Sequence, residues 1–495
     1  MPKRLLHIPD TEETDYIQLV EQDEGGKLEP YVALSYCWGK TGQPMTTYAS
    51  MPQFLRGIKL EDLPNTIKDA IRVTRQLGMK RLWVDSLCIH QDSNYDKTCQ
   101  ISQMPLIYGS ATLTIMASRA TDVHEGFLHE RPNVINPDNP RFSLRCVSGA
   151  GITENVILAP ESSGNDAIII EPLDSRAWCL QERFLSRRIL EFGSFQTRWN
   201  CQYREVLTDG FKHSDSVTKQ RSDRVFKQGL ELLLNYRHMK FPTSSRFDVW
   251  GDLVRLYSHR TLSLPSDRLP AISGIATLFA NTFGNEYVAG HWRSDLAREL
   301  LWTVSNRPGS SMRPVNYIAP SWSWASLNTG IEFGQRAEID DHFKIIECSK
   351  QHNIFHQDSY ISFHDIGLET YNFVVRGQVF PARVYRDKHE VISVRLRMMG
   401  NQALIFPADA ILDAIEDEVV KLGAGCFDVL LLRVNKPVKL KPEQYGPYDS
   451  GLILRQSSRN QYSRWGVYNY VVSKIRPLVH DKWFANCEEQ TITII

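Results

Sequence analysis

The chain has 495 residues, 42% of them apolar and 23% charged, with 57 Lys and Arg balanced by 57 Asp and Glu. This composition is typical of a globular protein with ample material for a core. The even balance, without a basic or acidic block, argues against binding to nucleic acids or to anionic membranes.

The apolar runs and the cysteines indicate in which cellular compartment the protein resides. The longest apolar runs, such as residues 429–432, are only as long as strands, and no apolar run of signal-peptide length opens the chain. No membrane span is therefore expected. The nine cysteines are an odd number spread along the chain, which favours reduced thiols over a disulfide framework. We expect a cytoplasmic protein.

Strand and helix patterns alternate at the start of the chain. Residues 31–36 form a short apolar and aromatic run that predicts a buried strand. A helix is predicted next, with residues 65–66 as its cap and Gly78 just past its end. Residues 81–85 predict a second strand that ends in an acid. Two parallel strands joined by a helix should form a right-handed unit.

A second helix, at residues 96–108, and a third strand, at residues 111–117, follow. Pro105 lies within this helix and is expected to kink or break it, because proline removes a donor and crowds the preceding turn. From residue 119 to residue 172 the pattern dissolves into Pro, Asn and Gly. We interpret residues 119–172 as an insertion that carries a hairpin or two. Its apolar runs are residues 156–158 and 168–170.

The stretch from residue 175 to residue 188 has residue types that suit a helix, with Asp174 or Ser175 as its cap. On a helix, Trp178 and Glu182 share a face because they are four residues apart. This sets a carboxylate beside a large aromatic surface, which can hold a flat substrate and stabilise a developing cation. In the alternative reading Trp178 is core and Glu182 is a solvated partner of a neighbouring arginine.

The remaining patterns divide the rest of the chain. Strands are predicted at 188–192 and 196–201, helices at 226–237, 247–257 and 270–283, and strands at 371–379, 391–398 and 426–434. The charged stretch 212–227 reads as a loop or exposed helix at a boundary. We therefore expect three regions: an α/β domain over 1–211 with the insertion, a mainly helical region over 212–318, and a β-rich region over 319–495.

Several polar and aromatic residues lie at or just past the ends of the predicted strands. They are Ser35, Tyr36, Trp38 and Asp85. Open α/β sheets bind ligands beyond the carboxyl ends of their strands, so these residues are candidates for binding a substrate. Tyr36 and Trp38 are equally well explained as packing for a loop, and Asp85 as the cap of the loop that follows it.

Cys88 and His90 are a weaker candidate for a nucleophile and its base. Both follow a strand end among apolar residues, and no activating partner is evident, so structural burial is favoured. The chain contains no Cys-x-x-Cys pair, which argues against structural zinc, and no metal ligands are assigned. It also lacks the Gly-x-Gly-x-x-Gly and Walker A sequences that mark common dinucleotide and nucleotide sites.

Three stretches resemble the signature blocks of the fungal heterokaryon-incompatibility (HET) domain. They are residues 31–39, 82–91 and 177–182. Residues 266–272 and 319–326 also resemble sequences that accompany this domain in long fungal proteins. The resemblance covers roughly residues 31 to 201. It implies a role in fungal self/non-self recognition, with regulated cell death as a form of innate immunity.

The HET domain is in turn similar to TIR domains, in which three strands alternate with two helices. The helix that follows them opens with Ser-x-x-Trp-Cys-x-x-Glu or a close variant. Ser175, Trp178, Cys179 and Glu182 fit that pattern at all four fixed positions. The resemblance implies a TIR- or flavodoxin-like parallel sheet and cleavage of NAD between nicotinamide and ribose. It makes Glu182 the catalytic residue and NAD a substrate, with no separate cofactor. The insertion and Pro105 depart from the TIR pattern and affect the geometry of the site.

The chemistry explains why one carboxylate is enough. The nicotinamide leaving group is already cationic, so it needs no proton, and a carboxylate near C1′ stabilises the oxocarbenium-like ribose. Ser35, Trp38 and Asp85 would supply ribose or phosphate contacts or a stacking wall. Two alternatives stay open. One is a non-catalytic signalling module that self-associates or binds a protein partner, and the other is an enzyme that tailors a small metabolite on the same scaffold.

Overall fold

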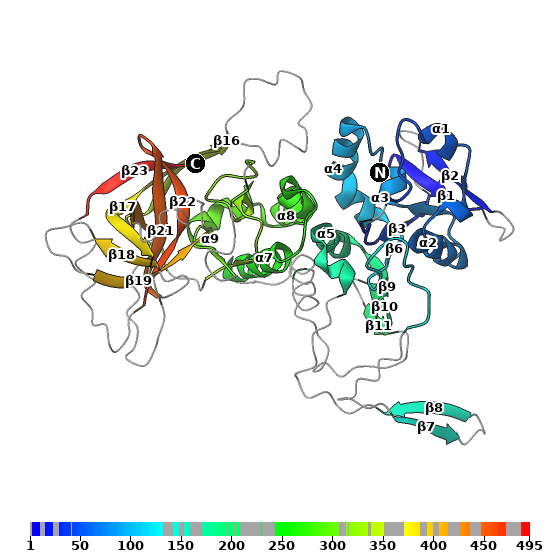
Figure 1. The fold of residues 1–495 in the computed structure, drawn as a ribbon. Coiled ribbons are helices and arrows are strands. Elements are labelled where there is room, and N and C mark those ends of the chain that lie inside the picture. The colour runs from blue at the N-terminus through cyan, green and yellow to red at the C-terminus, as the bar shows by residue number, and fades with distance from the viewer. Residues whose placement is uncertain are drawn as a thin grey trace. The chain divides into compact units, whose positions relative to one another are not determined.

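The computed structural model describes most of the chain, and every structural statement below concerns the described part. That part comprises residues 2–9, 15–22, 29–40, 42–131, 142–147, 153–158, 171–194, 196–201, 204–207, 229, 243–305, 313–314, 316–334, 338–350, 371–386, 394–398, 405–413, 426–435, 447–471 and 487–495. The chain divides into two compact units, residues 1–230 and 231–495 (Figure 1). The predicted division into three regions stays a prediction.

A nine-stranded sheet forms the centre of the first unit, in the order β11-β10-β9-β6-β3-β5-β1-β2-β4. Its strands are β1 Arg4–His7, β2 Tyr16–Glu21, β3 Val32–Ser35, β4 Ile58–Lys59, β5 Arg81–Trp83, β6 Leu113–Met116, β9 Arg188–Phe192, β10 Thr197–Cys201 and β11 Arg204–Leu207. The four adjacent strands β9, β6, β3 and β5 are parallel, and the flanking strands are antiparallel. The predicted strands at 31–36, 81–85, 111–117, 188–192 and 196–201 are thus confirmed.

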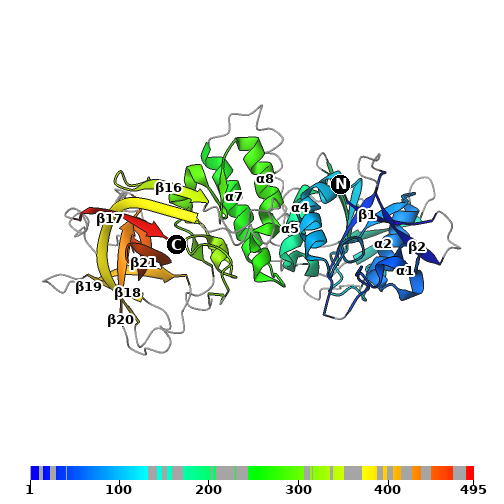
Figure 2. The same cartoon turned by 90° about the horizontal axis from the view of Figure 1, so that it is seen from above.

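Helices cover both faces of this sheet, with α4 and α5 on one side and α1 and α2 on the other (Figure 2). The helices are α1 Met51–Phe54, α2 Asn65–Gln76, α3 Asp85–Cys88, α4 Asn94–Ser110 and α5 Ala177–Leu185. Every residue of β3 and β6 is buried, which explains why these strands read as continuous apolar runs. Two hydroxyls fasten α4 to β3: Tyr31 Oη donates to the Ile107 carbonyl over 2.5 Å, and Tyr108 Oη to the Leu34 carbonyl over 3.1 Å.

The helices were predicted in the right places, but their caps differ. The N-cap of α2 is Pro64, and the Asn65 side chain donates instead to the backbone carbonyl of His124 over 2.8 Å. Gly78 has φ +69°, as expected of a glycine just past a helix end. The helix α4 continues through Pro105 without a break. One proline removes a single donor, and the hydrogen bonds on either side keep the segment helical.

The stretch that contains Glu182 begins later than predicted. A turn of 3₁₀ helix occupies Pro172–Ser175, where the Ser175 hydroxyl donates to the Pro172 carbonyl over 2.7 Å. Arg176 is therefore the N-cap residue of α5, and the cap at Asp174 or Ser175 was wrong. The helix also ends at Leu185, because Arg188 already begins β9.

The insertion contains one described hairpin, in which β7 Phe142–Val147 pairs antiparallel with β8 Thr153–Leu158. This agrees with the expectation of a hairpin or two in this segment, and the apolar run at 156–158 lies within β8. The apolar run at 168–170 and the charged stretch at 212–227 lie outside the described residues, as does the helix predicted at 226–237 except for residue 229.

The described part of the second unit begins with α7 Thr243–Ser258, α8 Pro270–Phe283 and the short α9 Leu296–Glu299. The helices predicted at 247–257 and 270–283 are thus confirmed. Two small antiparallel pairs accompany them: β12 Tyr287–Val288 with β13 His291–Trp292, and β14 Thr303–Val304 with β15 Ile331–Glu332. Aromatic packing joins these elements. The ring of Trp250, on α7, lies 5.7 Å from that of Phe279, on α8, and 5.2 Å from that of Trp292.

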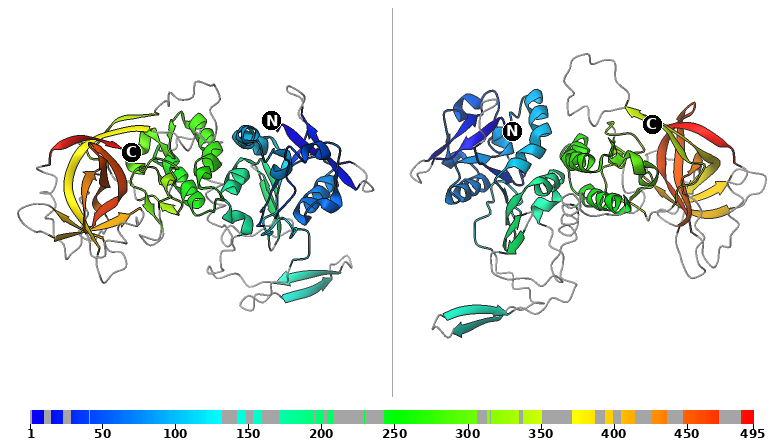
Figure 3. Two further views of the ribbon diagram at one scale, coloured as in Figure 1. Left: turned by 45° about the horizontal axis from the view of Figure 1, so that its top comes forward. Right: turned by 180° about the vertical axis from the view of Figure 1, so that it is seen from behind.

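The predicted β-rich end is a sheet of β16 Lys344–Lys350, β17 Tyr371–Arg386, β18 Val394–Met398, β19 Ile405–Leu412, β20 Cys426–Arg433, β21 Pro447–Ser458, β22 Gln461–Val471 and β23 Glu489–Ile494. The sheet curls until it closes, because β20 pairs with β17 as well as with β21 (Figure 3). The last strand, β23, pairs with both β17 and β22. Among the described residues, no helix combines the length and the apolar character needed to cross a membrane.

Candidate functional site

A buried polar cluster lies where β3 ends and α5 begins. Ser35 is the last residue of β3, and its hydroxyl donates to the carboxylate of Glu182, on α5. The same hydroxyl lies 3.7 Å from the sulfur of Cys179. Glu182 is only 5% exposed, so its carboxylate takes its contacts from the protein. This hydrogen bond joins β3 to α5 through two residues that are 147 positions apart in the chain.

The position of this cluster in the sheet is typical of a ligand site. The parallel strands occur in the order β5-β3-β6-β9, so the chain leaves β3 first to one side and then to the other. Crevices at such reversals, outside the carboxyl ends of the strands, are where open α/β sheets bind ligands. Ser35 lies at the carboxyl end of β3.

Asp85 joins the cluster from the end of the neighbouring strand. One of its carboxylate oxygens accepts from the indole N–H of Trp38 over 2.8 Å, and the other accepts from the backbone N–H of Ser86 over 2.7 Å. Asp85 is the first residue of α3 and not the last residue of the strand, which ends at Trp83. Asp85 thus contacts the backbone of the turn that it begins and also a second candidate residue, Trp38.

Tyr36 and Arg176 complete the cluster. The Tyr36 hydroxyl donates to Oε1 of Gln43 over 2.9 Å and lies 3.0 Å from the hydroxyl of Ser86. The Arg176 guanidinium donates to the backbone carbonyl of Tyr36. Arg176 was not among the predicted site residues, although it lies in the same signature stretch as Glu182. One signal in the sequence could have pointed to it. Arg176 is a cation directly before α5, and the first turn of that helix contains no acidic residue.

The electrostatics of the cluster depend on burial and on one cation. Burial raises the pKa of Glu182 above its usual range, the positive charge of Arg176 lowers it, and Asp85 raises it. Burial likewise raises the pKa of Asp85, and Arg176 opposes this shift too. A single guanidinium therefore offsets part of the cost of burying two carboxyl groups at the same strand ends.

Five of the six predicted site residues are linked by these contacts: Ser35, Tyr36, Trp38, Asp85 and Glu182. The sixth, Trp178, is half-buried and packs against the main hydrophobic core of the first unit. The cluster also includes Gln43, Ser86 and Cys179, which sequence reasoning did not select as site residues. Burial raises the pKa of the Cys179 thiol well above its usual value, so this cysteine is a neutral neighbour and not a thiolate.

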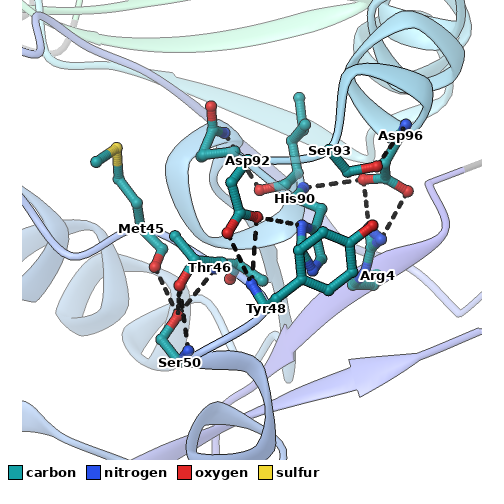
Figure 4. A network of polar contacts seen from close by, with 12 residues as sticks. Arg4, Met45, Thr46, Tyr48, Ser50, His90, Asp92, Ser93 and Asp96 are labelled. Carbon is teal, nitrogen blue, oxygen red and sulfur yellow. Dashed lines mark hydrogen bonds and ion pairs between the residues drawn. The ribbon is translucent and has the colours of Figure 1, made fainter.

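His90 belongs to a separate, structural network (Figure 4). The backbone carbonyl of Cys88 contacts the same network by accepting a hydrogen bond from Arg4 over 3.0 Å. Cys88 is fully buried, and burial raises its pKa to about 12, which confirms the expected structural burial. His90 is 4% exposed, and its Nδ1 lies 2.8 Å from Asp92. The His90 backbone N–H donates over 2.9 Å to Asp96, which also accepts two hydrogen bonds from Arg4 of β1. The network fastens β1 to the start of α4.

The loop that carries Trp38 depends on Gly39. This glycine has φ +79°, and a Cβ placed on it would collide with the carboxylate of Asp122. We expect Gly39→Ala to lower the free energy of unfolding by about 1–2 kcal/mol from the left-handed backbone alone, plus a steric term. Urea denaturation of the full chain measures this. Adding Asp122→Ala should recover only the steric term, and a Gly39→Ala variant as stable as the natural chain would contradict the assignment.

Comparisons with known proteins found matches to part of the chain. Residues 31–182 match the model of the family described as Heterokaryon incompatibility protein (HET). A curated relative, the "Heterokaryon incompatibility protein 6, OR allele" of Neurospora crassa, is 34% identical over 88 residues. That match covers 16% of this chain and 13% of the relative. No solved structure matches the chain. The residues of the polar cluster from Ser35 to Glu182 all fall within the matched segment.

Proposed function

We propose that this chain acts in fungal incompatibility and that its polar cluster cleaves NAD at the nicotinamide–ribose bond, since residues 31–182 match the HET family model. The curated relative, a heterokaryon incompatibility protein, supports the first part. The observation that carries the second part is the hydrogen bond from Ser35 to Glu182 at the carboxyl end of β3. The spatial order β5-β3-β6-β9 supports a TIR- or flavodoxin-like reading of the fold, since it corresponds to the flavodoxin order 2-1-3-4.

In the proposed reaction, the bond between C1′ of the ribose and the pyridinium nitrogen breaks. Its electron pair goes to the nitrogen, which leaves as neutral nicotinamide, and the ribose becomes oxocarbenium-like. The ionised Glu182 carboxylate stabilises this cation. Water then attacks C1′ and gives its proton to a carboxylate or to solvent, which leaves ADP-ribose. Neither an oxidant nor a metal ion is needed to balance the step.

The neighbours of Glu182 have distinct roles in this proposal. Ser35 orients the carboxylate through its hydrogen bond, and Arg176 favours the ionised form that the reaction needs. Asp85 and Trp38, which are hydrogen-bonded to each other, provide a polar group for the ribose hydroxyls and an aromatic wall for a flat ring. Removal of any one of them is expected to weaken the reaction less than removal of Glu182.

The burial of Glu182 favours a second candidate. A carboxylate on a residue that is 5% exposed does not reach a substrate until the cluster opens. The NAD-cleaving reading therefore requires an opened state, which self-association would supply. In the second candidate the cluster stays closed and the domain is a non-catalytic signalling module. The two readings differ in whether an assembled protein turns over NAD.

The deciding experiment compares the monomeric chain with the same chain fused to an oligomerising helix. Each is incubated with NAD, and nicotinamide and ADP-ribose are quantified by chromatography. Equal amounts of both products, formed faster by the oligomer, are the expected result. An oligomer that forms neither product would reject NAD cleavage and favour the signalling module.

The pH dependence of turnover tests the role of Arg176. Activity should fall as pH drops through the raised pKa of Glu182, because only the ionised carboxylate stabilises the cation. Arg176→Met removes the charge that lowers this pKa, so the acid limb of the profile should move to higher pH. The profile of kcat/KM against pH measures the shift.

Arg176→Lys provides the matched control, because it keeps the charge and should leave the limb close to that of the natural chain. A purely structural role for Arg176 would lower activity evenly at all pH values. An acid limb that stays in place in the folded Met variant would contradict the electrostatic role.

A further inference from the structure

A cavity of about 190 Å³ lies within the second unit, far along the chain from the Glu182 cluster. It is lined by helices α7 and α9, by β15 and the residues after it, and by Asn435, which follows β20. Its lining residues used below are Phe247, Asp252, Arg255, Arg298, Glu299, Glu332, Phe333 and Asn435. The family match ends at residue 182, before this part of the chain.

The charge of the lining is unbalanced. Among the described residues, five carboxylates and two guanidinium groups line the cavity, since Asp248 and Asp295 add to the acids above. Both guanidinium groups already contact carboxylates of the lining: Arg255 contacts Asp252 and, over 3.6 Å, Glu332, and Arg298 contacts Asp295 over 2.9 Å. The arginines are therefore held by ion pairs, and the net charge that a ligand would meet is negative.

Glu299 contributes to this negative charge from a buried position. It is 5% exposed, and one of its oxygens accepts from Nδ1 of His291 over 3.1 Å and from the backbone N–H of Trp292 over 2.9 Å. Burial lowers the pKa of His291 to about 3, so the histidine is neutral near pH 7 and supplies no positive charge to Glu299.

A second observation points to a ligand. Asn435 is 5% exposed, and its side-chain N–H donates to the hydroxyl of Ser450 over 2.8 Å. Its side-chain oxygen is buried and has no hydrogen-bond partner among the described residues. A buried acceptor without a donor costs about 1–3 kcal/mol, and a ligand that donates a hydrogen bond would remove this cost. The Asn435 oxygen accepts hydrogen bonds, and the excess of carboxylates attracts positive charge. Both features favour a ligand that is a cation and carries N–H donors.

The walls supply the apolar part of the site. Phe247 on α7 and Phe333 after β15 are both half-buried and both line the cavity. Aromatic rings attract organic cations through their negatively charged faces and also bury apolar surface. We propose that this cavity binds a small organic cation, an amine or guanidinium on an apolar body, with Glu299 and Asn435 accepting its N–H groups. This site is independent of the NAD chemistry proposed for the first unit.

Three matched probes test the proposal on the full chain by titration calorimetry. Benzylamine is a cation at pH 7, benzyl alcohol is its neutral counterpart and benzoate its anionic one. Benzylamine is expected to bind at least about tenfold more tightly than benzyl alcohol, because a hydrogen bond to a charged group is the stronger one. Benzoate should not bind measurably. Equal binding of all three probes, tighter binding of benzoate, or no heat from benzylamine at millimolar concentration would overturn the proposal.

Two variants locate the binding. Glu299→Gln keeps the shape of the side chain and removes its charge, and should weaken benzylamine binding by about tenfold. Glu332 is half-exposed, so Glu332→Gln should fold and should weaken benzylamine binding less than Glu299→Gln does. This second variant keeps the test valid if Glu299→Gln does not fold. Glu347→Gln, at an exposed position of β16 outside the lining, is the matched control and should bind as the natural chain does. If Glu299→Gln and Glu332→Gln both fold and both bind benzylamine as the natural chain does, benzylamine binds outside this cavity and the proposal is wrong.

Discussion

Glu182→Gln is expected to lower nicotinamide release from NAD by about a thousandfold. A carboxylate about 4 Å from a developing unit charge, at an effective dielectric constant of about 20, contributes roughly 4 kcal/mol, which corresponds to about a thousandfold in rate. Glutamine keeps the shape of the side chain and can still accept the hydrogen bond that Ser35 donates. Chromatographic measurement of nicotinamide, with natural and variant chains in the same assembled state, gives the ratio of rates.

The stability of this variant separates a catalytic role from a structural one. The pKa of Glu182 is raised in the folded state, so the stability linked to this group is lost as pH rises through that range. A neutral glutamine removes the cost of a buried charge. The variant should therefore unfold at the same or a higher temperature near pH 7.

Glu61→Gln, at an exposed position of the same unit, is the control and should retain full activity. Full turnover by Glu182→Gln would remove this residue from the mechanism. A loss of turnover accompanied by a large drop in melting temperature would mean that the residue is needed for folding.

Glu191→Gln is expected to have the largest effect on stability, a loss of about 3–5 kcal/mol. Glu191 is 2% exposed and accepts two hydrogen bonds from Arg183, over 2.6 and 3.0 Å, and one from Ser118 over 2.8 Å. The substitution leaves the Arg183 guanidinium, itself 8% exposed, without its closest carboxylate. Urea denaturation at pH 7 measures the loss.

The same pair predicts how stability depends on pH. Burial would raise the pKa of Glu191, but the charge and hydrogen bonds of Arg183 outweigh it and lower this pKa to about 2. The stabilisation is therefore present above the pKa of an unfolded glutamate, about 4.3, and is lost as pH falls through about 2. Glu191→Gln should flatten the fall in stability over this acid range.

The double variant Arg183→Leu, Glu191→Leu distinguishes a lost partner from lost packing. Replacing both members of a buried ion pair by apolar residues is often neutral or stabilising, so the double variant should be more stable than Glu191→Gln. If Glu191→Gln lowers the free energy of unfolding by less than about 1 kcal/mol, the value typical of exposed ion pairs, water reaches the pair of Arg183 and Glu191.

The order of strands and helices was predictable because it rests on local patterns. The apolar runs of β3 and β6 and the terminating Gly78 are visible in a short window of sequence. The helix caps were less predictable. The cap assigned to Ser175 failed because Pro172 begins a 3₁₀ turn there, and the residue types that suit a cap also suit such a turn.

The candidate site was predictable in outline and not in its charges. The rule that strand ends gather at one edge of a sheet placed Ser35 and Asp85 near each other. The burial of Glu182 and the part played by Arg176 depend on contacts between segments more than a hundred positions apart. A single sequence gives no measure of how such contacts offset the cost of burying a charge. The cavity of the second unit was missed for the same reason, since α9 and Asn435 meet only through the tertiary fold.

The closed sheet of the second unit has a consequence for the order in which the two units fold during synthesis. The strand β17 pairs with β20 and with β23, whose residues 489–494 are made more than a hundred positions later. Loop closure over such separations is slow, whereas the parallel strands β3, β5 and β6 of the first unit follow one another with α2, α3 and α4 between them. The first unit should therefore reach its native state while the second unit still has an open strand edge on the ribosome. A newly made chain would thus carry a folded first unit before its C-terminal unit is complete.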